Sequence, residues 1–178
     1  MRFIIGQKMI KIKDECKIKD ECTQVIRNEF FEIYECEEDS ICKIKTDKLE
    51  CEIETFKCVN KNKKEILFIA VDNCQFSSRD NFKKCDFLLV DEEEIVFVEL
   101  KINTKSRSRN RKKKRREAIE QLKSSIDKLR CLIENRKLYS YICFGKDFKI
   151  PNSSSQTKVI EFQEETNSIL KIECIKEF

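Results

Sequence analysis

The feature that most constrains the fold of this chain is the stretch at residues 85–101, CDFLLVDEEEIVFVELK. Two apolar runs of four residues flank a four-residue acidic connection. Apolar runs of this length, rich in branched and aromatic side chains and separated by a short polar turn, predict a β-hairpin. If the acidic connection is the turn, its midpoint falls between Glu92 and Glu93, and residues whose numbers sum to 185 face one another. The hairpin therefore places Asp86 opposite Glu99.

Charged side chains at the open end of this hairpin indicate a site. Glu99 and Lys101 share a face because side chains alternate along a strand, and directly opposed side chains of an antiparallel pair lie about 5 Å apart. Two carboxylates at that separation repel, so one resists ionisation unless a cation lies between them. Mg²⁺ and Mn²⁺ prefer such oxygen ligands, and a neighbouring lysine can orient or deprotonate a water for attack on a phosphodiester. The alternative is a solvated hairpin with charged ends.

Asp86, followed after twelve intervening residues by Glu99, Leu100 and Lys101, resembles the signature of the PD-(D/E)xK nuclease superfamily. The resemblance covers about residues 63–145. It implies that Asp86 and Glu99 bind Mg²⁺ or Mn²⁺, helped by the backbone carbonyl of Leu100, and that Lys101 is the catalytic lysine that activates or positions the hydrolytic water. A cysteine stands where the family name has proline, a departure that the superfamily often shows.

The helix that follows carries a further candidate. Residues 111–136 predict a helix with an apolar seam at three- and four-residue spacing, formed by Ile119, Leu122, Ile126, Leu129 and Ile133. Beside this seam, Gln121 resembles the glutamine that many superfamily members carry on the helix after the lysine strand. There the glutamine faces the active site and contacts the phosphate or orders a water. A surface glutamine on a helix is the alternative.

Two accessory acidic positions are also predicted. Asp72 ends the most apolar run of the chain, at the edge where an antiparallel neighbour beginning with Asp86 would start. It is either an accessory site residue or the cap of a turn. Members of the superfamily often carry an acidic residue on a helix before the sheet. Residues 23–34 predict such a helix, on which Glu29 or Glu32 would take that role unless they are simply exposed.

A basic run begins at the proposed catalytic lysine. Residues 101–116 hold ten basic residues and no acidic one, which leaves 27 basic against 33 acidic residues elsewhere. At the start of a helix these charges oppose the macrodipole and repel one another, whereas a phosphate backbone would stabilise them through counterion release. The lack of aromatic residues favours backbone contact over base stacking; a solvated basic loop is the alternative. The predicted nucleic-acid-binding residues are Lys105, Arg107, Arg109, Arg111, Lys112, Lys113, Lys114, Arg115 and Arg116.

Eleven cysteines and no histidine narrow the chemistry. Without histidine, Ser-His and Cys-His nucleophiles and histidine–metal nucleases are excluded, and the absence of any CxxC pair argues against zinc. An odd cysteine count at irregular spacing fits a disulfide framework poorly. We expect cysteines in apolar stretches to act as small hydrophobes, and hence a reducing, cytoplasmic location; these are Cys85, Cys131, Cys143 and Cys174.

The rest of the pattern predicts a single α/β domain over residues 1–178. We expect no signal peptide and no membrane span, because the longest apolar run has six residues. The order helix, three strands, helix, strand matches the resemblance, which implies a restriction-endonuclease-like core (α-β-β-β-α-β) with a central mixed sheet flanked by helices. We expect three parts. The N-terminal extension (1–62) has a helix and then a hairpin or meander at 41–45 and 49–58, and the core (63–145) has further strands at 66–72 and 139–144. The C-terminal hairpin (146–178) has a loop at 151–156 and strands at 159–162 and 169–175.

The leading functional hypothesis is a Mg²⁺- or Mn²⁺-dependent nuclease acting on DNA, with RNA open. One alternative is a non-catalytic protein with the same fold that binds nucleic acid or a partner protein, although such a copy would be expected to lose Asp86, Glu99 or Lys101. A third hypothesis is a protein that binds acidic proteins through its basic run. The chain is too short for a separate target-recognition domain, so a site-specific enzyme would need a homodimer or a partner that confers specificity.

Overall fold

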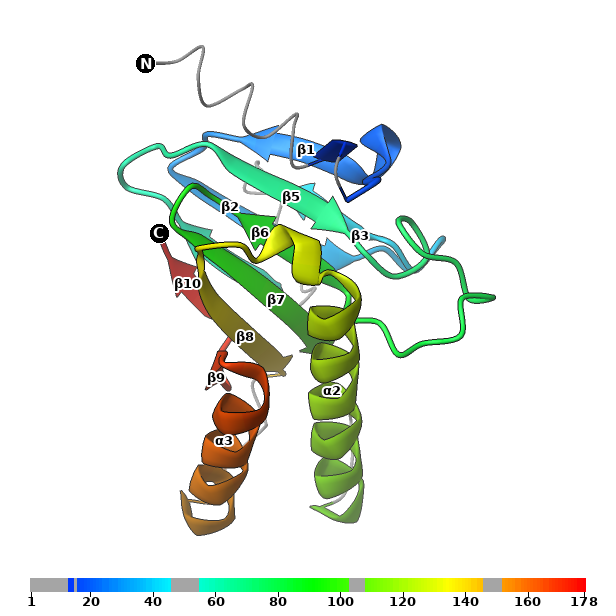
Figure 1. Ribbon diagram of the computed structural model, residues 1–178, viewed down its shortest axis with the longest axis vertical. Helices are drawn as coiled ribbons and strands as arrows, with labels where there is room; N and C mark the ends of the chain where they lie inside the picture. Colours follow the sequence, from blue (N-terminus) through cyan, green and yellow to red (C-terminus); the bar gives the residue numbers. More distant parts are fainter. Residues whose placement is uncertain (1–12, 15, 46–54, 103–107, 146–151) are drawn as a thin grey trace.

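The computed structural model describes residues 13, 14, 16–45, 55–102, 108–145 and 152–178 and shows a mixed α/β structure with two mixed sheets (Figure 1). The larger sheet has six strands in the order β1-β5-β6-β7-β8-β9. Its first four strands run antiparallel to their neighbours, whereas β7, β8 and β9 are parallel. The bounds are β1 (Thr23–Ile26), β5 (Ile66–Ala70), β6 (Phe87–Val90), β7 (Glu94–Lys101), β8 (Lys137–Phe144) and β9 (Ile169–Lys171).

The second sheet has four strands in the order β10-β4-β2-β3 and packs on one face of the first. Phe56 of the small sheet, for example, contacts Phe87 and Tyr141 of the large sheet edge to face, with ring centroids 5.7 and 5.4 Å apart. The bounds are β10 (Ile175–Glu177), β4 (Phe56–Val59), β2 (Phe30–Glu35) and β3 (Cys42–Lys45).

Two helices, α2 (Ser108–Lys128) and α3 (Asn152–Thr166), cover the other face of the large sheet (Figure 1). The apolar seam predicted for the long helix is confirmed, because Ile119, Leu122, Ile126 and Leu129 are all buried against the sheet. The helix ends earlier than predicted and is followed by a 3₁₀ turn at Arg130–Leu132. The large sheet is therefore the middle of three layers, and its central strands are buried on both sides.

The two hairpin strands are apolar at successive positions because both of their faces are buried. In β6, Leu88 and Val90 face the helices, while Phe87 and Leu89 face the small sheet. All four residues of β6 are buried. Strands that are covered on both faces have continuous apolar sequences. Such a sequence therefore predicts a central strand, as the structure shows for β5, β6 and the apolar part of β7.

The helix predicted over residues 23–34 is wrong, because this segment forms β1 and β2. A different apolar pair in this segment, Phe31 and Ile33, has the period of two that a strand requires. In β2, Phe31 and Ile33 are buried under the large sheet, whereas Phe30 is exposed. The predicted strand at 41–45 is confirmed as β3, but it does not pair with β4, since β2 lies between them.

The predicted C-terminal hairpin is also wrong. Residues 159–162 belong to α3, in which Phe162 is buried and Ile160 is 57% exposed, as expected for one apolar side of a helix. The loop expected at 151–156 overlaps the start of the same helix, at Asn152. β9 and β10 enter different sheets and therefore do not form a hairpin.

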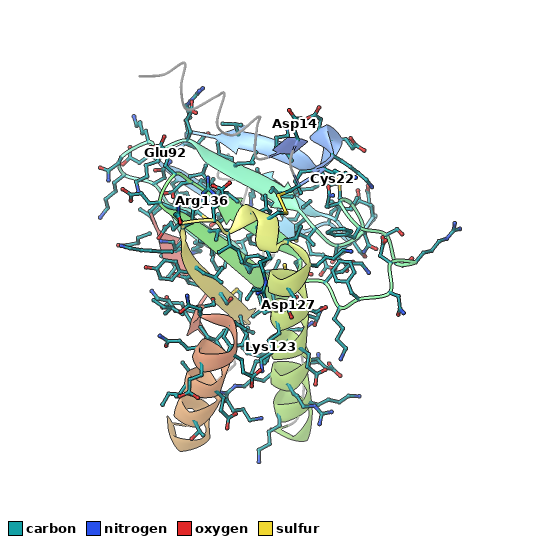
Figure 2. All side chains as sticks on the ribbon, viewed as in Figure 1. Asp14, Cys22, Glu92, Lys123, Asp127 and Arg136 are labelled. Carbon is teal, nitrogen blue, oxygen red and sulfur yellow. A yellow bond between two sulfur atoms is a disulfide. The ribbon has the colours of Figure 1, made fainter. Side chains whose placement is uncertain are left out.

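The expectation against a disulfide framework is wrong, because the structure has the disulfides Cys16–Cys131, Cys22–Cys74 and Cys143–Cys174 (Cys22 is labelled in Figure 2). Of the four cysteines expected to act as small hydrophobes, three are therefore paired. Irregular spacing along the sequence carried no information about these pairs, which join residues 115, 52 and 31 positions apart. Cys85 is free and fully buried, as predicted. Disulfides persist in oxidising compartments, so the predicted cytoplasmic location loses the support of unpaired cysteines. Among the described residues, no helix is long and apolar enough to cross a membrane.

Candidate active site

The hairpin has the predicted register. β6 and β7 pair from Phe87 with Val98 to Val90 with Ile95, which are residues whose numbers sum to 185. Directly before β6, the backbone N–H of Asp86 donates to the carbonyl of Val98 at 3.1 Å. The Asp86 carbonyl in turn accepts the N–H of Val71, just past β5, at 2.9 Å. Asp86 is thus held by its backbone between the two neighbouring strands.

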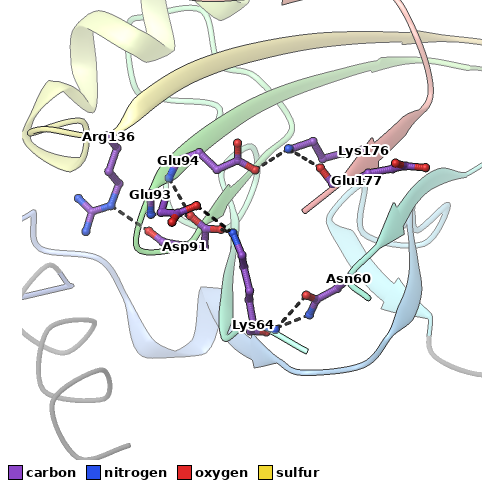
Figure 3. Close-up of polar contacts among 8 residues, drawn as sticks. All are labelled: Asn60, Lys64, Asp91, Glu93, Glu94, Arg136, Lys176 and Glu177. Carbon is purple, nitrogen blue, oxygen red and sulfur yellow. Dashed lines mark hydrogen bonds and ion pairs between the residues drawn. The ribbon is translucent and has the colours of Figure 1, made fainter. Parts of the chain in front are cut away.

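The acidic turn at the closed end of the hairpin fixes this register (Figure 3). The Asp91 carboxylate accepts the backbone N–H groups of Glu93 and Glu94, each at 2.7 Å, as an aspartate that caps a turn does. Lys64 contacts the same carboxylate at 3.3 Å, and the Arg136 guanidinium donates to the Asp91 carbonyl at 3.0 Å. A slip of one residue would break all of these contacts, so the turn determines which residues meet at the open end.

At the open end, the buried carboxylate of Glu99 and the partly exposed carboxylate of Asp86 repel each other. The backbone N–H of Leu100 donates to Asp86. Glu99 is only 1% exposed; its Oε1 pairs with Lys101, and its Oε2 is buried without a hydrogen-bond partner among the described residues. Burial, and then the charge of Asp86, raise the pKa of Glu99 well above its usual range. Burial also raises the pKa of Asp86 to about 7, against the opposing effect of the Leu100 amide. A carboxylate oxygen buried without a donor is expensive, so this geometry favours a cation.

Lys101 is held by two partners on opposite sides. Its ammonium group pairs with Glu99 and donates to Oε1 of Gln121 at 2.9 Å. The amide nitrogen of Gln121 donates to the backbone carbonyl of Lys84 at 2.8 Å. Burial by itself lowers the pKa of Lys101, but the charges of Glu99 and Asp86 outweigh it and raise this pKa. Lys101 is therefore a positioned cation, and the structure brings Gln121 into contact with it, as the sequence led us to expect.

The helix α2 contacts both Lys101 and the backbone directly before Asp86. Its seam residue Leu122 is fully buried against the sheet, which turns the adjacent Gln121 toward the strand ends. One turn later, Ser125 is fully buried, and its hydroxyl accepts the backbone N–H of Cys85 at 2.7 Å. The helix therefore fixes the residue before Asp86 as well as the partner of Lys101.

Asp72 lies directly after β5 and beside Asp86, whose carbonyl accepts the Asp72 N–H at 3.4 Å. One of its carboxylate oxygens accepts the N–H of the next residue, Asn73, at 3.1 Å, whereas an aspartate that caps a turn bonds the backbone two residues on. Its charge also contributes, behind burial, to the raised pKa of Asp86 and of Glu99. Beside the site lies an open pocket of about 360 Å³, lined by Asp72, Lys83, Lys84, Glu117 and Gln121.

The structure does not bring Glu29 or Glu32 to the site. Glu29 is exposed in the turn between β1 and β2, at the end of the sheet that begins β5 and not at the end that carries Asp86. Glu32 lies within β2 and is half-buried. Sequence reasoning instead missed Glu35, at the end of β2, whose charge adds to the effect of burial on the pKa of Asp86. No sequence signal identified Glu35, because its segment read as a helix.

Sequence reasoning also missed the Lys84 carbonyl and Glu117. A backbone acceptor carries no side-chain signal, so the contact between Gln121 and Lys84 was not predictable from residue types. Glu117, in contrast, has a signal. It lies four residues before Gln121 in the same helix, and residues at that spacing share a face.

The basic run divides into exposed and buried parts. Lys112, Lys113 and Arg116 are exposed and Lys114 is half-buried, as phosphate contacts would require. Arg115 is only 8% exposed, so the structure does not support it as a contact. Lys105 and Arg107 lie outside the described residues, as do the side chains of Arg109 and Arg111.

The residues present suit a hard divalent cation with few protein ligands. Within the described parts of the chain, no group of three or more histidine, cysteine, aspartate or glutamate residues could hold a metal ion. The candidate is thus a two-carboxylate site. Mg²⁺ is commonly bound by one or two carboxylates, with water and substrate phosphate supplying the remaining ligands. The orphaned oxygen of Glu99 and the raised pKa of Asp86 both fit such an ion.

No protein-family model matches the chain, and searches of curated proteins and of solved structures likewise returned no match. What the site can do therefore has to be worked out from its own residues.

Proposed function

We propose that this protein is a metal-dependent nuclease that hydrolyses phosphodiester bonds, with DNA as the expected substrate. The observation that carries the proposal is the arrangement at Glu99. One oxygen of this buried carboxylate pairs with Lys101, while the other has no donor in the part of the chain that the structure describes and lies close to the charge of Asp86. A divalent cation next to the second oxygen would satisfy it and would keep both carboxylates ionised.

The strand order supports the resemblance to the PD-(D/E)xK superfamily. Three antiparallel strands (β5, β6, β7), a helix (α2) and a strand parallel to the third (β8) follow one another in the chain. This is the order that the resemblance implies for a restriction-endonuclease-like core. In place of a helix before the three strands, the described residues have β1.

Each of the site residues has its own role in the proposed reaction. Asp86 and Glu99 would hold Mg²⁺ or Mn²⁺ together with the Leu100 carbonyl, and the bound metal would polarise the phosphate and lower the pKa of a water. The Lys101 ammonium, a cation held at the edge of this pair, positions the attacking water and offsets the charge that develops on the phosphate. Gln121 fixes Lys101, because its own amide is anchored to the backbone at Lys84.

The experiment is a cleavage panel with purified protein. Linear, circular, single-stranded, branched and RNA substrates are incubated with Mg²⁺, Mn²⁺ or EDTA. We expect cleavage that requires a divalent metal and that is lost in Asp86→Ala and Glu99→Ala. Matched changes at the closed end of the hairpin, such as Glu92→Ala, should leave activity intact, because that side chain is exposed and remote from the site. Cleavage of the same rate in EDTA would contradict the proposal.

The alternative is a non-catalytic protein of the same architecture that binds nucleic acid or a partner. The ion pairs that Lys113 and Arg116 make with Glu117 and Glu120, at 3.9 and 3.7 Å, show that part of the basic run also has structural partners. This alternative predicts salt-sensitive binding that needs no metal, without cleavage of any substrate. A homodimer or a partner that confers sequence specificity stays a prediction.

A further inference from the structure

The pocket beside the catalytic residues has a wall that the sequence did not suggest. This wall is the connection between β5 and β6, residues 71–86, which returns to the sheet against α2. Three contacts attach it there: Lys83 pairs with Glu120, the Lys84 carbonyl accepts from Gln121, and the Cys85 N–H donates to Ser125. Lys83 also lines the pocket, together with Gln121.

The helix α2 therefore lies between this connection and α3. On the side of α3, Lys123 pairs with Glu165 (Figure 2). Residues seven apart share a side of a helix, because two turns take 7.2 residues. Lys114 is thus on the side of Gln121, about 10 Å further along the axis. Arg116 is two turns before Lys123, and it pairs at 3.7 Å with Glu120, the carboxylate that also pairs with Lys83.

The two sides of α2 differ in the groups that they face. Toward α3, Lys123 of α2 already pairs with Glu165, and the other exposed charged side chains described on α3 are Glu161, Glu164 and Lys158. On the other side, the exposed Lys83 lines the pocket together with Asp72, Lys84, Glu117 and Gln121. The half-buried Lys114 lies two turns before Gln121 on the same side of the helix.

We propose that Lys83 and Lys114 form a phosphate-binding track, in which one nucleic-acid strand lies along the Gln121 side of α2 and its phosphates on the two sides of the reacting bond contact these two lysines. The inference rests on the proposed function and deepens it, since it assigns the path of the substrate and one contact, Lys83, that lies outside the basic run. The ligand class is the sugar-phosphate backbone of a single strand, within or outside a duplex.

The present partner of Lys83 does not prevent this contact. The ammonium pairs with Glu120, but the two side chains are 57% and 42% exposed. Exposed ion pairs contribute only about 0–1 kcal/mol, whereas a phosphate contact gains from the release of a condensed counterion. Lys83 can therefore exchange the carboxylate for a phosphate at small cost.

The test is binding of a fluorescent oligonucleotide, single-stranded and duplex, by anisotropy in EDTA at salt concentrations between about 50 and 200 mM. Lys83→Ala and Lys114→Ala should each weaken binding by about 5- to 10-fold near 0.1 M salt and lower the slope of log K against log salt by about 0.7–0.9. Lys158→Ala, the matched exposed lysine on α3, should change neither. Glu120→Gln, which releases both Lys83 and Arg116, should tighten binding, and the part of this gain that comes from Lys83 should disappear in the Lys83→Ala background.

A Lys83→Ala variant with the affinity and salt slope of the wild type would overturn the proposed phosphate-binding track. Equal losses of affinity in Lys83→Ala and Lys158→Ala would overturn it too, and so would a wild-type protein that binds no oligonucleotide. Cleavage is measured separately in Mg²⁺. If the salt slopes change as expected and no substrate is cut, the track stands and the nuclease proposal fails. If cleavage is observed and Lys83→Ala keeps the wild-type KM and salt slope, the nuclease stands and the track fails.

Discussion

Replacement of Asp86 by asparagine should stabilise the metal-free protein at alkaline pH. The carboxyl has its pKa raised from 3.8 to about 7, mainly by burial. A raised carboxyl pKa means that the folded state binds the proton more tightly than the unfolded state. The resulting stabilisation is complete below about pH 4, decreases as the pH rises toward 7, and is lost above it. In the wild type, the free energy of unfolding should therefore fall across this window.

The magnitude follows from the shift. At about 1.4 kcal/mol per unit, the shift in Asp86 corresponds to about 4 kcal/mol. Because Asp86 is partly exposed, solvent screens part of it, and we expect a fall of about 2–3 kcal/mol between pH 4.5 and 8. An asparagine at this position would keep an acceptor for the Leu100 N–H and does not titrate, so Asp86→Asn should match the wild type at pH 4.5 and exceed its stability by this amount at pH 8.

The assay is urea unfolding in EDTA at a series of pH values, followed by circular dichroism. Asp127→Asn is the matched control, because that side chain is 70% exposed on the surface of α2 and should leave the wild-type pH dependence unchanged. An Asp86→Asn variant that loses as much stability as the wild type between pH 4.5 and 8 would refute the reasoning, since the carboxyl would then not be held in its neutral form.

Three further outcomes are expected. Mg²⁺ at 100 times its dissociation constant should stabilise the folded wild type by about 2.7 kcal/mol, and this stabilisation should grow as the pH rises through 7. It is measured as a thermal shift, and a shift of equal size in Glu99→Gln would argue against the site. Gln121→Ala, which releases Lys101, should lower kcat by about 10- to 100-fold with little change in KM, whereas Gln163→Ala on α3 should change neither; a defect confined to KM would contradict a positioning role. Loss of the 52-residue disulfide loop in Cys22→Ser should reduce the free energy of unfolding by about 4 kcal/mol. A dithiol reductant should reduce it further, because it also opens Cys16–Cys131 and Cys143–Cys174, and an unchanged stability in Cys22→Ser would contradict the prediction.

The site could be predicted from the sequence because it depends on local geometry. The hairpin turn is only four residues long, so one assumption about its midpoint set the register that brings Asp86 and Glu99 together. The spacing of the apolar seam in the long helix likewise gave the orientation of Gln121. Both inferences use only the periods of a strand and a helix, which hold over short distances in the chain.

Features that depend on distant parts of the chain could not be predicted. The apolar residues of β2 fit a helical period and a strand period equally, and only its position over Phe87 and Tyr141 of the large sheet decides between them. Phe162 is ambiguous in the same way until α2 is in place. The disulfide Cys22–Cys74 joins two segments whose proximity follows from the pairing of β1 with β5, and so the cysteine pattern alone did not reveal it.

The most direct test of the central claim compares metal-dependent cleavage by the wild type with that by Asp86→Ala and Lys101→Ala, at equal concentrations of protein shown to be folded by circular dichroism. Lys61→Ala, an exposed lysine in the turn before β5, serves as the control. The proposed site predicts cleavage by the wild type and the control, and a loss of about 100-fold or more in both site variants. Undiminished cleavage in both Asp86→Ala and Lys101→Ala would contradict it.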